Sequence, residues 1–291
     1  MNNDNYMGLG GFHWFTGVVE DRNDPLKVGR VKVRIIGAHT SDKTILPTED
    51  LFWSSVMLPI TASGISGIGQ SATGLLEGSW VFGFFRDGAR SQDAVILGSL
   101  PGRPTQGANS SQGFFDPNGV YPRYINEPDT NRLAVNNGEK PHPSLAIDAA
   151  NRITDIQAYN SEWSQPASTY AAVYPFNQVY ESESGHIVEF DDTEGAERIH
   201  IRHRSGTRSE ITANGDQLAI TKGDNYILID GNNKVYIAGS SDITVNGNAN
   251  IRAAGDVGVL ASNIDITATG NINMDAGGNV VITGTRIDLN P

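Results

Sequence analysis

Residues 223–255 read GDNYILID-GNNKVYIA-GSSDITVN-GNANIRAA-G, so that a glycine recurs every eight residues. The spacing begins earlier in the chain, and the next position at this spacing, eight residues after Gly255, holds Asn263, a residue type that also adopts left-handed backbone angles at low cost. We therefore predict a turn at each octad boundary, with positive φ at glycines such as Gly231 and Gly239. The predicted turn positions are Gly215, Gly223, Gly231, Gly239, Gly247, Gly255 and Asn263.

Between these turns, apolar residues alternate with polar ones, as in a short β-strand that buries one face. The register slips by one residue near Asn263, and the alternation then resumes. Within one octad, Ile243 and Val245 are predicted to point inward, whereas Thr244 and Asn246 face water. The predicted inward positions are Ile227, Ile229, Val235, Ile237, Ile243, Val245, Ile251, Ile264, Ile266, Ile272, Met274, Val280 and Ile282.

Such short strands cannot build a core within one chain, because each offers only two or three inward side chains. Neighbouring chains must supply the other walls, and a three-sided prism is the most economical arrangement. No aromatic residue follows Tyr236, which suits a narrow prism, and no proline lies between Pro175 and Pro291, which suits continuous ladders. The octads thus predict an intertwined triple-stranded β-helix in a homotrimer.

The rest of the chain divides into two further segments. Residues 1–104 carry five short, apolar runs separated by Gly- and Pro-bearing loops, a pattern typical of a five-stranded OB-fold barrel. In the run 30–36, Val31, Val33 and Ile35 are predicted to face inward, and Arg30, Lys32 and Arg34 outward. Residues 105–180 are predicted to be an extended linker with a short helix over 144–156, capped by Ser144. The triple-stranded β-helix, named here the needle, is predicted to occupy residues 181–291, and the whole chain is predicted to be all-β.

Composition excludes several classes of partner and site. The 291 residues include 21 Lys and Arg against 33 Asp and Glu, a net charge of −12, which disfavours binding to nucleic acid. Cysteine is absent, so disulfides, thiolate metal sites and thiol nucleophiles are excluded. No membrane-spanning stretch or signal sequence is evident, and we expect that the protein is made and used without export through a signal peptide.

Four stretches resemble the central spike proteins of contractile-tailed bacteriophages. They are residues 17–34 (GVVEDRNDPLKVGRVKVR), 59–69 (PITASGISGIG), 115–123 (FDPNGVYPR) and 184–192 (SGHIVEFDD). The octads are similar to the C-terminal triple-stranded β-helix of that family, which is shared with the valine-glycine-repeat spikes of type VI secretion.

The resemblance implies a structural role in the virion, at the tail baseplate. It implies a homotrimer whose OB-fold domains attach to a trimeric hub protein, and whose needle pierces the host envelope mechanically. It also implies a blunt tip capped by a PAAR-repeat protein. The chain ends TRIDLNP, so Ile287, Leu289 and Pro291 are the predicted tip-docking residues. No cofactor is expected.

Several members of this family carry a lysozyme domain between barrel and needle, but the roughly 55 residues between Glu127 and Ser182 are too few for one. The carboxylates of Asp148, Asp155 and Glu162 are interpreted as solvated surface acids. We therefore predict a spike that is not an enzyme.

A metal site is not expected either. In a strand, His200 and His203 would point to opposite faces, which disfavours shared ligation. The acidic run 189–197 instead predicts cross-strand ion pairs with the arginines of 198–204, in a hairpin that turns at 192–196. Near the C-terminus there is no His-x-His pattern that could hold a tip metal.

Two alternatives remain. One is the spike of a phage-derived or type VI-like injection system, although such chains usually also contain the hub barrels. The other is a polysaccharide-cleaving tailspike, whose parallel β-helix uses coils of about 20 or more residues, which an octad cannot form. If each octad of residues 205–291 advances by one strand spacing of ~4.8 Å, the needle is about 50 Å long.

Overall fold

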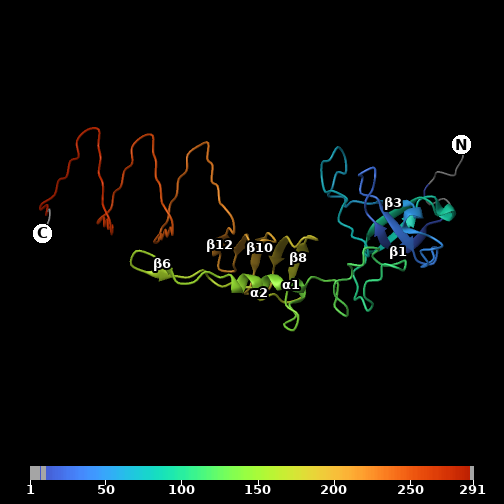
Figure 1. The fold of residues 1–291 in the computed structure, drawn as a ribbon. Helices are drawn as coiled ribbons and strands as arrows, with labels where there is room; N and C mark the ends of the chain where they lie inside the picture. Colours follow the sequence, from blue (N-terminus) through green and yellow to red (C-terminus); the bar gives the residue numbers. More distant parts are fainter. Residues whose placement is uncertain (1–6, 8–10, 289–291) are drawn as a thin grey trace. The chain divides into compact units, whose positions relative to one another are not determined.

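The computed structural model describes residue 7 and residues 11–288. The chain divides into two compact units, residues 1–156 with 162–236 and residues 157–161 with 237–291. The first unit contains a barrel and a separate sheet, whereas the second contains most of the octads. Figure 1 shows the elements along the chain.

Five strands near the N-terminus form a closed barrel, which confirms the predicted barrel. Its strands pair in the order β1-β2-β3-β5-β4, and only the β3–β5 pair is parallel. Two short 3₁₀ turns, Thr48–Asp50 and Gly88–Arg90, interrupt the connections. The strands are β1 (His13–Asp21), β2 (Val31–Ile35), β3 (Trp53–Val56), β4 (Trp80–Phe85) and β5 (Ala94–Ser99).

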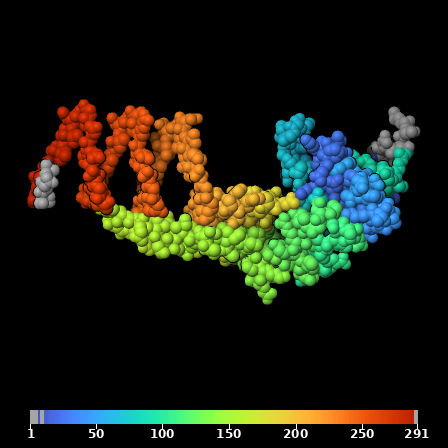
Figure 2. Space-filling view, in the orientation of Figure 1, coloured from blue at the N-terminus to red at the C-terminus, as the bar shows by residue number. Residues whose placement is uncertain are grey.

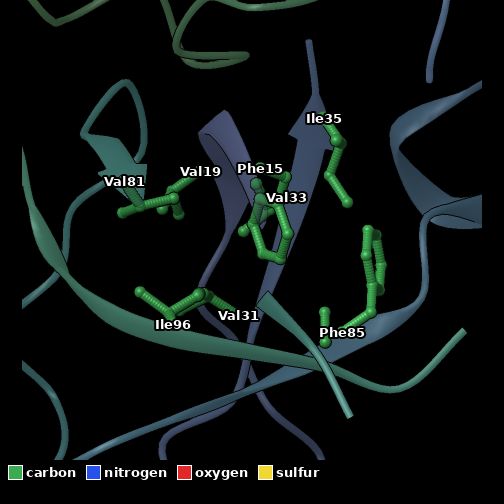
Figure 3. Close-up of a cluster of buried hydrophobic side chains, with 9 residues drawn as sticks. Phe15, Val19, Val31, Val33, Ile35, Val81, Phe85 and Ile96 are labelled. Atoms are coloured by element: carbon green, nitrogen blue, oxygen red, sulfur yellow. The ribbon is translucent and has the colours of Figure 1, made fainter. Parts of the chain in front are cut away.

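The barrel interior is filled by branched and aromatic side chains. Val31, Val33 and Ile35 of β2 point inward as predicted, and Figure 3 shows them facing Phe15, Val81 and Ile96 across the interior. Close approach of β1 to β2 requires Gly17, because a Cβ there would lie 2.5 Å from Val33 Cγ1.

Lys32 and Arg34 lie on the outer side of β2, as predicted, but they do not reach solvent. Their side of β2 is covered by the segment after the strand and by the loop around Phe114. Arg34 is fully buried and donates to both Glu20 carboxylate oxygens, at 2.6 and 3.0 Å. The Phe114 amide also donates to Glu20, at 2.9 Å, and Lys32 Nζ donates to the carbonyl oxygen of Glu49 at 2.6 Å. The Arg34–Glu20 ion pair thus holds the loop at Phe114 against the barrel wall, and Lys32 holds the loop at Glu49.

Along the sequence, two short helices and a small hairpin follow the barrel and precede the second sheet: α1 (Arg132–Val135), α2 (Pro143–Ala150), β6 (Ile156–Gln157) and β7 (Glu162–Trp163). The helix predicted over 144–156 therefore begins one residue earlier and ends at Ala150. Its cap is His142, which accepts a hydrogen bond from the Ser144 amide, and not Ser144, because Pro143 occupies the first helical position.

A second, five-stranded antiparallel sheet follows the helices, in the sequential order β8 to β12. Its strands are β8 (Asn177–Glu181), β9 (Ile187–Asp191), β10 (Arg198–Arg202), β11 (Arg208–Ile211) and β12 (Gln217–Ile220). The turn predicted at 192–196 is the connection between β9 and β10. In the described part of the chain, no helix is long and apolar enough to cross a membrane.

Candidate assembly surfaces

The second sheet has its polar face buried and its apolar face exposed. Along β9, β10 and β11 the charged side chains are covered, whereas Tyr180, Phe190 and Ile201 on the opposite face are half or more exposed. The register places Phe190 opposite Ile199, and Ile199 opposite Ile211, so these side chains form one continuous patch. Sheets normally bury the apolar face, so this face is a candidate interface.

The buried polar face is organised around Glu189. Its carboxylate is fully buried and accepts from Arg198 Nη2 at 2.6 Å and from Asn177 Nδ2 at 2.9 Å, and it pairs with His200 Nδ1 at 2.7 Å. Arg198 also pairs with Glu210 at 3.1 Å. Burial alone would raise the pKa of Glu189, but the bond to His200 and the charge of Arg198 lower it. The predicted cross-strand ion pairing is thus confirmed for Glu189.

Residues 131–155 and 164–176, named here the strap, contribute the side chains that cover this polar face. Tyr170 donates from its hydroxyl to the carbonyl oxygen of Leu133, and Asn177 donates to the same carbonyl. Ser168 Oγ donates to Glu210 at 2.8 Å. Because the strap occupies the polar face, the apolar face is the one left open.

Asp148 belongs to this covering, which corrects its interpretation as a solvated acid. Its carboxylate forms ion pairs of 3.1 Å with both Arg202 and Arg208, across the strap–sheet contact. Asp155 and Glu162 are exposed. No grouping of these three carboxylates occurs, because Asp148 lies on α2 and the other two lie toward the β6–β7 hairpin.

His200 and His203 do not converge, as expected from strand alternation. His200 points into the buried network, whereas the exposed His203 contacts Ser205 through Nδ1 at 2.8 Å. Among the described residues, no three His, Asp or Glu side chains gather in an arrangement that could hold a metal ion.

The octads form an extended, unpaired trace. Residues 221–288 belong to no helix or strand, and every one of them is exposed in the single chain. Figure 2 shows the orange and red turns separated from one another, with no other side chains packed between them. All the predicted inward side chains are therefore uncovered; Ile243 is 86% exposed and Ile251 90%.

The octad boundaries coincide with bends in the chain, at 222–223, 230–231, 238–239, 246–247, 254–255 and 262. The prediction of positive φ at Gly231 and Gly239 is wrong, since among the predicted turn positions only Gly215 has it, at 82°. The corners are made without the left-handed region, and a Cβ at Gly231 or Gly239 would have no neighbour within 4 Å.

The tip falls partly outside the described residues. Ile287 is half-exposed, whereas Leu289 and Pro291 lie beyond residue 288. Their predicted role in docking a tip protein stays a prediction.

Sequence reasoning missed the exposed face of the second sheet. The signal was the alternation in residues 188–191 and 198–202, where apolar and ionisable residues take opposite faces. The charged residues of these strands were predicted to form ion pairs, but the alternation itself gives no partner for the opposite, apolar face.

Comparison with known proteins agrees with this architecture. Residues 37–178 match the family described as the Gp5 N-terminal OB domain. Protein Gp5 of Vibrio phage KVP40 is 48% identical over 246 residues, which cover 73% of this chain and 58% of that protein. The pre-baseplate central spike protein Gp5 of Enterobacteria phage T4 is 38% identical over 199 residues, covering 66% of this chain and 34% of that protein.

Proposed function

We propose that this chain, which is similar to the Gp5 proteins of two phages, is the axial spike of a contractile-tail baseplate and pierces the host envelope mechanically. The observation that carries the proposal is the stretch 221–288, in which regularly spaced aliphatic side chains are all exposed and the chain bends every eight residues. A chain of this kind lacks a core until others join it.

The proposed assembly is a homotrimer wound about one axis. Three copies of each inward position, such as Ile243, would meet at one level and remove their apolar surface from water. The exposed face around Phe190 and Ile201 would be covered by the neighbouring copies, so that the trimer begins at the second sheet. Winding strands into a closed prism leaves no lateral edge along the shaft.

The needle's dimensions suit penetration of an envelope. Strands β11 and β12 take residues up to 220 into the sheet, which leaves residues 221–288 for the winding. At ~4.8 Å per octad they would extend about 40 Å, somewhat less than the length expected for residues 205–291. That length is comparable with the ~40–45 Å of a bilayer with its headgroups.

We propose that this chain works without hydrolysis. Of Asp148, Asp155 and Glu162, only Asp148 is partly buried. It is held between two arginines and forms no acid–base pair with another carboxylate. The T4 relative is named as a central spike protein. The test is clearance of peptidoglycan by the purified protein; we expect none, and clearance would contradict the proposal.

The proposed partners are a trimeric hub protein that receives the OB-fold domains and a PAAR-repeat protein that caps the tip at Ile287, Leu289 and Pro291. The host envelope is contacted only transiently. Neither nucleic acid nor a cofactor is part of the proposal.

Limited trypsin digestion tests the wound needle. Lys234 and Arg252 are exposed in the single chain, as all residues of 221–288 are. In the wound trimer, the backbone at both sites would be held in ladders, so we expect resistance to cleavage under native conditions. The same protein dissociated by heating serves as the control. Rapid native cleavage at Lys234 and Arg252 would contradict the proposal.

A further inference from the structure

An arm of the barrel displays isoleucines to solvent. The arm comprises residues 58–75, which belong to the connection between β3 and β4, and Figure 1 shows this connection as a loop that stands away from the barrel. Ile60 is 103% exposed, Ile65 66% and Ile68 68%. The three side chains cover no part of the core, so their exposure calls for a contact outside the chain.

The arm has its own internal order. The Ala62 amide donates to Pro59 and the Ile68 amide to Ile65, both at 2.9 Å, and Ser63 Oγ donates to the carbonyl oxygen of Ile68. Gly69, with φ of 104°, lets the two limbs approach, because a Cβ there would lie 2.7 Å from the Ser63 amide nitrogen. A pre-ordered apolar loop loses little conformational entropy on binding, which favours a recognition role.

The arm carries no charged side chain, which determines the kind of surface that it can contact favourably. No ionisable side chain occurs between Asp50 and Glu77, in a chain whose net charge is −12. Copies of so acidic a chain repel one another, so a surface that meets another copy is best uncharged. An uncharged arm satisfies that condition.

The same barrel carries a cavity that could receive an apolar knob. Its volume is about 610 Å³, and Trp80, Leu100, Phe115 and Tyr121 line it together with three prolines. Its charged lining groups are engaged elsewhere. Asp129 accepts from the Gly102 amide at 2.7 Å, Asp116 accepts from three amides of the following turn, and Arg103 donates to the carbonyl oxygen of Asn126.

We propose that the arm of one subunit inserts Ile65 and Ile68 into this cavity on the neighbouring subunit. No residue of the arm lines the cavity within its own chain. Each barrel carries one arm and one cavity, so the contact is heterologous, and three copies would close it into a ring. The inference rests on the proposed trimer, whose needle would hold the three barrels at high local concentration.

Cysteine cross-linking tests the contact in the full-length protein. The chain has no cysteine, so introduced thiols are the only ones present. The test protein carries Ile65→Cys and Leu100→Cys, and a short bismaleimide joins thiols that lie close together. The control carries Ile45→Cys with Leu100→Cys, since Ile45 is an equally exposed isoleucine, at 72%, on another loop.

We expect covalent trimers from the test protein on a denaturing gel, at least fivefold more than from the control, and none from either single-cysteine protein. Native mass measured beforehand separates the two proposals. A native trimer that cross-links no better than the control, or only within one chain, overturns the arm-to-cavity contact but leaves the spike. A native monomer overturns both.

Discussion

The substitution Ile243→Asp probes the interior of the proposed needle. Ile243 is 86% exposed in the single chain, so nearly its whole side chain is available for burial by other copies. Burying such a side chain stabilises by about 1.5–3 kcal/mol, hence roughly 5–9 kcal/mol for the three copies. Three carboxylates at one level of the axis would add several kcal/mol each of unfavourable desolvation.

We expect this variant to lose the trimer, measured by its mass in solution and by its resistance to heating in detergent. Asn246→Asp is the matched control, because it places the same charge on the outward side of the same octad and is expected to change stability by less than about 0.5 kcal/mol. Trimers of Ile243→Asp with the stability of the unchanged protein would refute the axial placement.

Three further predictions concern other parts of the chain. Glu20→Gln, which leaves the fully buried Arg34 without its ion pair, is expected to destabilise the barrel by about 3–5 kcal/mol in denaturant unfolding, whereas Arg86→Gln in an exposed pair costs under about 1 kcal/mol; equal effects would contradict the buried lock. The lowered pKa of Glu189, together with that of Glu181, which is lowered by its bond to His142, means that the sheet gains stability above the ordinary glutamate pKa of 4.5 and loses it as the pH falls further. The melting temperature of the sheet and strap is therefore expected to be level above about pH 5 and to drop in acid, less steeply in Glu189→Gln; a profile without that drop would be inconsistent with the network. Leu289→Lys is expected to leave the trimer intact while abolishing capture of the tip protein in a pull-down, and retained capture would rule out the docking role.

The barrel could be predicted from the sequence because its inward residues alternate strictly. The alternation of Val31, Val33 and Ile35 predicted one buried face of β2, and all three side chains lie in the barrel core. The burial of Arg34 could not be predicted in this way, because alternation indicates on which face of a strand a side chain lies but not what covers that face. Its cover comes from the loop at Phe114, about 80 residues further along the chain.

The candidate surfaces were predicted in part. The octad spacing identified the bends at Gly231 and Gly239 as well as the aliphatic positions between them, since both depend on local periodicity. Their backbone angles were not predicted correctly, because a corner between two extended segments can also form outside the left-handed region. The reversed faces of the second sheet depend on the strap, whose non-periodic residues gave no indication of where it would pack.

The number of chains in the native protein tests the central claim most directly. Light scattering coupled to size-exclusion chromatography, on the full-length protein at near-neutral pH, measures that mass without reference to shape. We expect three times the mass of one chain, unchanged on dilution, because the inward side chains of residues 221–288 are all uncovered in the single chain. A stable, well-behaved monomer would contradict the account, since those side chains would then have no core to join.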